Sequence, residues 1–172
     1  MAPLDSFSLF STNVSSSYQV FLNFRGEDTR NNFVGFLHKT LTDRGIIVFL
    51  DEGGMKTGDA IDQSLEKAIK GSKIYIPVFS KRYAESKWCL QELSLMVECK
   101  KKSSEDHLIL PIFFHVQPLD VERQTGYFTK AFSNYEITHK EDVGKWREAM
   151  NFVGNSTDER MNLTGVSINK NE

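Results

Sequence analysis

The sequence predicts an α/β protein in which a parallel sheet carries helices on both faces. Short apolar runs rich in β-branched and aromatic residues, which suit buried strands, recur along the chain. Segments whose apolar residues follow helical spacing separate these runs, and this alternation is typical of parallel sheets. With 172 residues, the chain is long enough for one domain with a sizeable core.

Composition excludes several classes of function. With 26% charged and 40% hydrophobic residues, the chain resembles a soluble globular protein, and no apolar run approaches the roughly 18 residues of a membrane span. The net charge of -2 gives no basic field for nucleic acid or an anionic membrane. Cys89 and Cys99 form neither a disulfide framework nor a metal-ligand pattern, which favours a reducing compartment. We therefore expect no metal, no membrane contact and no nucleic-acid partner.

The first part of the chain holds two predicted strands. Residues 1–17 are serine-rich without periodicity and are expected to form a flexible leader. The apolar run 18–24 predicts the first strand, and the β-branched run 46–50 predicts the second. Between them, Gly26 allows a tight turn, and Asp28 or Thr29 could cap the helix that follows.

The helix between these strands is predicted from its apolar periodicity. Phe33, Phe36, Leu37 and Leu41 recur at helical spacing, and Gly45 is a typical stop. This periodicity favours the core for Phe36.

The middle of the chain contains a loop, two helices and a third strand. The glycine-rich segment 51–59 is expected to be a flexible loop, and it is not a Walker loop because Gly-Lys-Ser/Thr is absent. A helix with apolar residues between 61 and 69 ends at Gly71. The run 74–79 predicts a strand, and the next helix starts at Ser86, which can cap it, and continues into a triple lysine.

The last part predicts a fourth strand and two helical segments. The fourth strand covers 108–116, and a short irregular segment follows around Pro118. A weak helical stretch near 128–132 precedes a clear helix around Trp146. The segment 155–172 is expected to be a tail or linker.

Two prolines lie inside predicted strands. Pro77 and Pro111 each remove a donor from the hydrogen-bond ladder. Each must therefore lie where its missing N–H would have pointed away from a neighbouring strand, or at a bulge.

The start of the Ser86 helix is the candidate site. Trp88 and Glu92 are four residues apart and therefore share one helical face. Because ligands of open parallel sheets bind outside the carboxyl ends of the strands, this face should line a cleft. A carboxylate beside an indole there could act on a flat, charged ligand.

From the residues alone, simpler interpretations stay open. A glutamate in the first turns of a helix is usually solvated and favoured by the helix dipole, and a lone tryptophan more often packs in a core. Arg25 and Arg30 could pair with Glu27 and Asp28 on the surface. The triple lysine at 100–102 favours a solvated helix end over a nucleic-acid patch.

Several separated motifs resemble one family. Residues 18–26 read Y-x-V-F-L-x-F-R-G, residues 86–93 read S-K-W-C-L-Q-E-L, and residues 110–116 read L-P-I-F-F-H-V, before Gln124-Thr125-Gly126. In this order and spacing they resemble, over about 18–154, the plant Toll/interleukin-1 receptor (TIR) domain of nucleotide-binding, leucine-rich-repeat immune receptors. The resemblance implies a flavodoxin-like fold with five parallel strands in the order 2-1-3-4-5, and an NAD⁺-cleaving activity that self-association switches on.

The resemblance also assigns roles to individual residues. Glu92 matches the family's catalytic glutamate, and Trp88 matches the aromatic residue one turn before it. Gly58 matches the glycine that closes the so-called BB loop. The loop after the first strand, which contacts NAD⁺ in the family, is matched by Phe24, Arg25, Gly26, Glu27 and Arg30. NAD⁺ is then the substrate, so no cofactor is expected.

The chain departs from the family pattern at three places. Gly53, Gly54 and Thr57 stand where relatives carry more charged residues. Gly35-Phe36 replaces a Ser-His pair that often lies in a helix–helix contact. Gln117 and Leu119 replace the Asp and Ser of a V-D-P-S-D segment.

Two functions follow as hypotheses. The first is an NAD⁺ nucleosidase of plant immunity, located in the cytoplasm or also the nucleus, whose partners are other TIR domains and downstream immune signalling proteins. The second is a catalytically idle adaptor that signals only through TIR–TIR contacts. A phosphoacceptor receiver domain is excluded, because Phe79-Ser80 stands where the third strand would need an aspartate.

Overall fold

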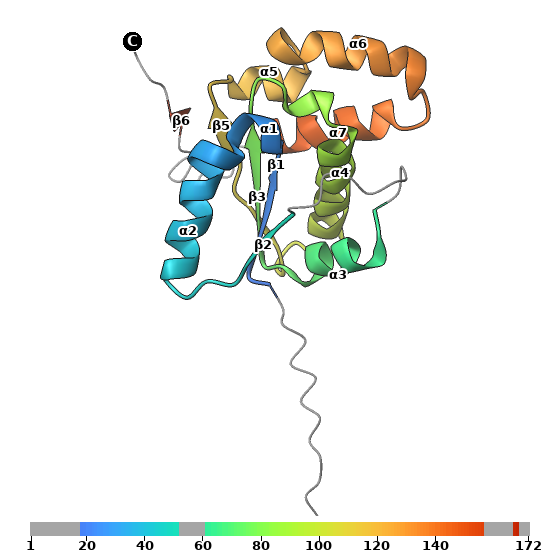
Figure 1. Cartoon of the computed structure of the whole chain (residues 1–172). Helices are drawn as coiled ribbons and strands as arrows, with labels where there is room; N and C mark the ends of the chain where they lie inside the picture. Colours follow the sequence, from blue (N-terminus) through green and yellow to red (C-terminus); the bar gives the residue numbers. More distant parts are fainter. Residues whose placement is uncertain (1–17, 52–60, 157–166, 169–172) are drawn as a thin grey trace, which may run out of the picture.

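A six-stranded parallel sheet lies at the centre of the structure, a computed structural model that describes residues 18–51, 61–156 and 167–168 (Figure 1). The strands are β1 (Val20–Phe24), β2 (Val48–Leu50), β3 (Ile74–Phe79), β4 (Leu108–Ile109), β5 (Ile112–Phe114) and β6 (Ser167–Ile168). The α-helices are α1 (Gly26–Thr29), α2 (Gly35–Asp43), α3 (Gln63–Gly71), α4 (Lys87–Lys102), α5 (Pro118–Arg123), α6 (Thr129–Thr138) and α7 (Val143–Gly154). Three short segments complete the described elements: the π-helical turn η1 (Arg30–Val34) and the 3₁₀ turns η2 (Tyr83–Glu85) and η3 (Gly126–Phe128).

The strand order confirms the predicted fold class. The sheet runs β2-β1-β3-β5-β6, with β4 paired to the first half of β3, and every pair is parallel. Because β4 and β5 together make up the predicted fourth strand, this is the expected order 2-1-3-4-5. The fifth position is filled by β6, which lies inside the segment 155–172 that was expected to be a tail or linker.

The prolines explain why the fourth strand is split. The Tyr75 carbonyl accepts from Leu110 N–H at 2.8 Å, so Tyr75 bonds toward β4. Pro77 is two residues further and faces the same side, because backbone groups alternate along a strand. The N–H that Pro77 lacks would therefore have pointed at the break at Leu110-Pro111. This break separates the part of β3 that pairs with β4 from the part that pairs with β5.

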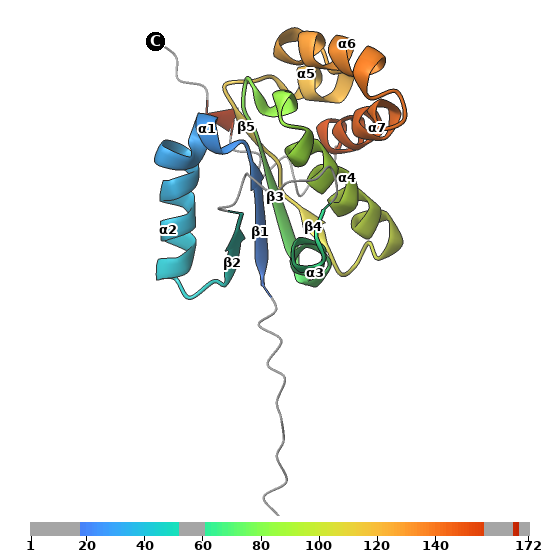
Figure 2. The same ribbon diagram turned by 45° about the vertical axis from the view of Figure 1, so that its right-hand side comes forward.

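Two apolar clusters cover the two faces of the sheet. Val20, Leu22 and Phe24 pack with the side chains of η1 and α2 on one face. Phe21 lies between Val20 and Leu22 in the strand, so its side chain points to the opposite face. There it packs with residues of α3, α4 and α7. In Figure 2, α2 lies on one side of the strands, while α3 and α4 lie on the other.

The first helix differs from its prediction. Phe36 is 72% exposed, so the expectation that it packs in the core is wrong. Its neighbours Phe33, Leu37 and Leu41 do pack against the core. A π-helical turn precedes Gly35 and changes the angular register that a continuous α-helix would have. A Cβ at Gly35 would stand 2.6 Å from the Arg30 carbonyl oxygen, so glycine is what this turn needs.

Helix starts were predicted with mixed success. Ser86 caps α4 as expected, accepting from Cys89 N–H at 3.2 Å. Asp28 and Thr29 do not cap α1, because the helix already begins at Gly26 and contains both of them. The segment at Pro118 is a short helix and not irregular, because proline suits the first helical position, where no N–H is needed.

Several expectations fall on residues that the structure does not describe. They are the leader 1–17, the loop residues Gly53, Gly54, Thr57 and Gly58, and most of 157–172. Within the described ranges, no helix is long and apolar enough to cross a membrane.

Candidate functional site

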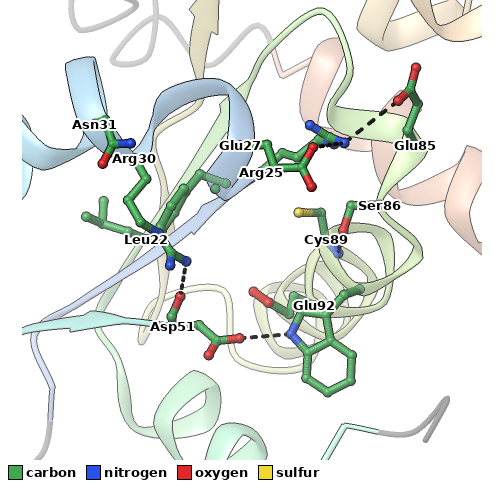
Figure 3. Close-up of a pocket in the computed structure, with 13 residues that line it drawn as sticks. Leu22, Arg25, Glu27, Arg30, Asn31, Asp51, Glu85, Ser86, Cys89 and Glu92 are labelled. Atoms are coloured by element: carbon green, nitrogen blue, oxygen red, sulfur yellow. Dashed lines mark hydrogen bonds and ion pairs between the residues drawn. The ribbon is translucent and has the colours of Figure 1, made fainter. Parts of the chain in front are cut away.

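A cavity of about 520 Å³ opens at the carboxyl ends of β1 and β2, where α1 and α4 begin. A volume of this size is typical of small-molecule sites. Figure 3 shows side chains from these elements converging on it. The lining comprises Leu22, Phe24, Arg25, Gly26, Glu27, Arg30, Asn31, Asp51, Glu85, Ser86, Trp88, Cys89 and Glu92. All the site residues predicted within the described ranges are in this set, and Gly58 lies outside the described residues.

The first two turns of α4 present Trp88 and Glu92 to the cavity. The Trp88 indole is partly buried and packs against the core cluster on its side of the sheet. Its Nε1–H donates to Asp51 Oδ2 at 2.9 Å, which restrains the orientation of the ring. Trp88 is therefore both a core residue and a wall of the cavity.

Glu92 lies at the bottom of this site. Glu92 is 3% exposed, and its Oε2 accepts a hydrogen bond from Asn23 Nδ2 at 3.2 Å. Burial raises the pKa of Glu92 well above its ordinary value, the Asn23 hydrogen bond opposes this rise, and the nearby Asp51 charge adds to it. A buried carboxyl with a raised pKa in a cavity is typical of functional sites.

Arg25 lies at the rim and is held by carboxylates. Its guanidinium bonds Asp28 at 2.7 Å and Glu27 at 2.8 Å, and its side chain is 13% exposed. The surface-pairing interpretation is thus realised for Arg25, although the same side chain lines the cavity. Glu27 is 77% exposed, so this pair is weak, and an anion could replace Glu27 as a partner of the guanidinium.

Arg30, the first residue of η1, ties this turn to the end of β2. Its Nη2 donates to the Asp51 carbonyl at 2.9 Å, and the guanidinium lies 5.6 Å from the centre of the Phe24 ring. A Cβ at Gly26 would stand 3.0 Å from Arg30 Nη2, so Gly26 leaves room for this side chain as well as allowing the turn. Arg30 thus contacts the end of β2 and the Phe24 ring.

A sequence profile of the family described as TIR domain matches residues 17–168. This chain belongs to the TIR-domain family. The match covers most of its length and includes β1 to β6.

The TIR domain is similar to parts of plant disease resistance proteins. It is 44% identical over 141 residues to disease resistance protein RPV1 of Vitis rotundifolia, covering 82% of this chain and 10% of that protein. It is 44% identical over 142 residues to TMV resistance protein N of Nicotiana glutinosa, and this match covers 81% of this chain and 12% of that protein. The chain thus spans about a tenth of the length of these curated relatives.

A solved structure supports the same grouping. The TIR domains in the structure of the activated Roq1 resistosome directly recognizing the pathogen effector XopQ align with a TM-score of 0.74 and 42% identity. The alignment covers 81% of this chain and 84% of that chain.

Sequence analysis did not assign Asn23 and Asp51 to the TIR site, although both bond its central residues. Asn23 contacts Glu92, and the only signal was one amide in an otherwise apolar strand. Asp51 follows β2 directly, at the carboxyl edge where ligands of parallel sheets bind, but it was assigned to the loop. Both make their site contacts with residues 21 to 69 positions away in the sequence. Among the residues in the structure's described ranges, no group of three or more His, Cys, Asp or Glu side chains could hold a metal ion.

Proposed function

We propose that this TIR domain is an NAD⁺ nucleosidase, which releases nicotinamide and leaves ADP-ribose-type products as immune signals. The observation that carries the proposal is the buried carboxylate of Glu92 beside the Trp88 indole, in one cavity with two guanidinium groups. Membership of the TIR family and likeness to plant disease resistance proteins support the biological setting.

The chemistry needs few residues. Cleavage of the bond between ribose and nicotinamide develops positive charge on the ribose, as in glycoside hydrolysis. Nicotinamide leaves as a neutral molecule from a pyridinium, so no proton has to be supplied to it. One carboxylate fixed near the ribose can stabilise the developing cation and orient the hydroxyl groups. Glu92 can do this only in its ionised form, so its raised pKa sets a lower pH limit on activity.

The rest of the cavity suits the remainder of NAD⁺. The Trp88 ring, held by Asp51, offers a face on which nicotinamide or adenine can stack. Arg25 and Arg30 can bind the diphosphate, because a guanidinium donates in a fork that matches phosphate oxygens. For Arg25 the exposed Glu27 partner would be replaced by the phosphate.

One assay tests the proposed function. Purified protein at high concentration is incubated with NAD⁺, and released nicotinamide is measured over time. Turnover that the Glu92→Gln variant lacks supports the nucleosidase. No release at any concentration or under crowding would leave the idle adaptor as the function of this domain.

Asp51 provides a prediction about pH. Its charge raises the pKa of Glu92, so Asp51→Asn should lower that pKa. Because activity rises with pH as Glu92 ionises, the midpoint of the rising limb should move to lower pH in this variant. The amide oxygen can still accept from the Trp88 indole, which keeps the ring in place. An unchanged midpoint in a pH–rate profile would contradict the assigned effect of the Asp51 charge on Glu92.

We also propose that activity depends on contacts between copies, as the resistosome setting of the similar TIR domains suggests. The exposed side of α2 offers a surface, because Phe36 is 72% exposed there beside Lys39, whose side chain is 74% exposed. The partners would be other TIR domains and, through the products, downstream immune proteins. The free thiols Cys89 and Cys99 suit the cytoplasm or the nucleus.

A substitution at Phe36 tests whether this surface of α2 mediates association. Specific activity should rise with protein concentration, and Phe36→Asp should remove most of the rise without lowering the melting temperature, because no core contact is lost. The matched control is Ile137→Asp on α6, where the side chain is 75% exposed. Equal specific activity at all concentrations would show that the monomer is already complete.

A further inference from the structure

The amide of Asn23 is buried where the strand pattern calls for an apolar side chain. β1 reads Val-Phe-Leu-Asn-Phe, all five residues are buried, and Asn23 is 0% exposed. Burying an amide costs free energy unless its donors and acceptor are bonded. The contacts of Asn23 therefore indicate why an amide stands at this position.

Those contacts all lie beside Glu92. Asn23 Nδ2 donates to the Cys89 carbonyl at 3.2 Å and to Glu92 Oε2 at 3.2 Å. The Tyr83 hydroxyl donates to Asn23 Oδ1 and lies 3.3 Å from the same Cys89 carbonyl. Tyr83 is itself 0% exposed, so water does not compete for the amide.

The direction of these bonds fixes the amide. A backbone carbonyl can only accept, so the NH₂ group of Asn23 must face Cys89, and its second N–H then points at Glu92. The amide oxygen faces Tyr83, which can donate to it. Glu92 therefore accepts through Oε2, and this bond favours Oε1 as the place for a proton on the carboxyl. Oε1 is therefore the oxygen left for the substrate.

We propose that Tyr83 and Asn23 form a positioning relay for Glu92: the Tyr83 hydroxyl fixes the Asn23 amide, and the amide holds Oε2 so that Oε1 faces the ribose of the bound dinucleotide. This inference rests on the proposed function. Asn23 and Tyr83 touch no substrate and act only through Glu92.

The relay also favours the ionised carboxyl. An amide donor bonds a carboxylate more strongly than a carboxylic acid, so it opposes the effect of burial on Glu92. The other ionisable groups that line the cavity with this carboxyl are Asp51 after β2, Cys89 on α4, the guanidinium groups of Arg25 and Arg30, and the rim carboxylates of Glu27 and Glu85.

Charged groups of α3 and α7 line a different cavity. Glu66 of α3 and Lys145 of α7 line it together with Glu98, along another face of α4. Loss of the Asn23 donor should therefore act on Glu92 without a compensating charge from these helices.

The test compares three variants in the intact domain. Asn23→Leu removes the donor at similar volume, and Tyr83→Phe removes only the hydroxyl that fixes the amide. Tyr75→Phe is the matched control, because Tyr75 is also 0% exposed and its hydroxyl bonds the Ile69 carbonyl at 2.8 Å, on a strand–helix contact away from Glu92. Each protein is assayed for nicotinamide release from acid to alkaline pH, and its melting temperature is recorded.

Asn23→Leu should lower turnover at neutral pH about tenfold and move the midpoint of the rising limb to higher pH. Tyr83→Phe should do the same to a smaller extent, and Tyr75→Phe should leave the midpoint unchanged although it too loses a buried hydrogen bond. A structural role alone would lower the melting temperature and scale the whole profile without moving its midpoint. That result, or a midpoint that moves equally in Tyr75→Phe, would overturn the relay.

A second measurement separates the relay from the nucleosidase proposal. Carbon-13 NMR of the Glu92 carboxyl reads its titration in the protein without NAD⁺. The midpoint should lie higher in Tyr83→Phe than in the wild type, even if no nicotinamide is released. An identical titration in the two proteins would reject the relay, whereas an inactive wild type would reject only the nucleosidase. Should Asn23→Leu fail to fold, Tyr83→Phe still decides the question.

Discussion

Glu92→Gln is expected to lower the rate of nicotinamide release about 100- to 1,000-fold while the circular dichroism spectrum stays unchanged. Loss of one preorganised electrostatic group has effects of this size in other enzymes. Glutamine keeps the volume of the side chain and an acceptor for the Asn23 donor, so only the charge is lost. Steady-state rates of the two purified proteins at one concentration check the prediction.

The matched control for this variant lies on the same helix. Glu98 is on α4 and pairs with Lys102 at 2.6 Å, away from the cavity. Glu98→Gln should keep wild-type turnover. If Glu92→Gln also keeps it, Glu92 has no part in the reaction and the proposed mechanism is wrong.

The same substitution should change how stability depends on pH. The folded-state pKa of Glu92 lies above its unfolded value, so the folded protein binds the proton more tightly. The free energy of unfolding therefore falls as pH rises from the unfolded pKa toward the folded one. Glu92→Gln removes this loss, so its melting temperature should exceed that of the wild type at neutral pH, and the advantage should shrink toward pH 4. Thermal melts across this range check the sign.

Trp88→Ala should damage both substrate binding and stability. The indole packs against the core, so truncation should cost roughly 2–3 kcal/mol of unfolding free energy, less than for a fully buried tryptophan. If the ring also stacks on NAD⁺, binding should weaken by about 1–3 kcal/mol, which is the scale of base–aromatic stacking. Melting temperature and KM measured on one preparation report the two effects separately.

Trp88→Phe separates these two effects. Phenylalanine keeps an aromatic face and most of the core contact, and it loses only the indole donor to Asp51. It should retain most of the stability and a KM close to that of the wild type. A Trp88→Ala protein that melts lower but keeps the wild-type KM would make Trp88 a purely structural residue.

Local patterns predicted most of the fold because it is built from strongly patterned elements. The runs at 18–24 and 74–79 are apolar on both faces, as central strands must be, and Gly45 and Gly71 end their helices as expected. Phe36 was misplaced, because a π-helical turn has no periodic signal in sequence. The break in the fourth strand was not predicted, because the sequence does not show which neighbour Pro77 and Pro111 each face.

The site was less predictable than the fold. The four-residue spacing placed Trp88 and Glu92 on one face of α4, and both line the cavity. The partners that define their chemistry, Asn23 and Asp51, come from β1 and the end of β2. These contacts depend on how the sheet packs on α4, and no local pattern encodes that packing.

The pairing of β6 with β5 has a practical consequence for work on this domain. β6 bonds along Phe113 and Phe114, the last residues of β5, and so covers that side of the sheet. A shorter version that ends before residue 167 would leave those N–H and C=O groups bare. Exposed strand edges invite pairing with other chains and promote aggregation. Light scattering would rise with concentration in such a protein, and clustering through a cut edge could then be mistaken for signalling assembly.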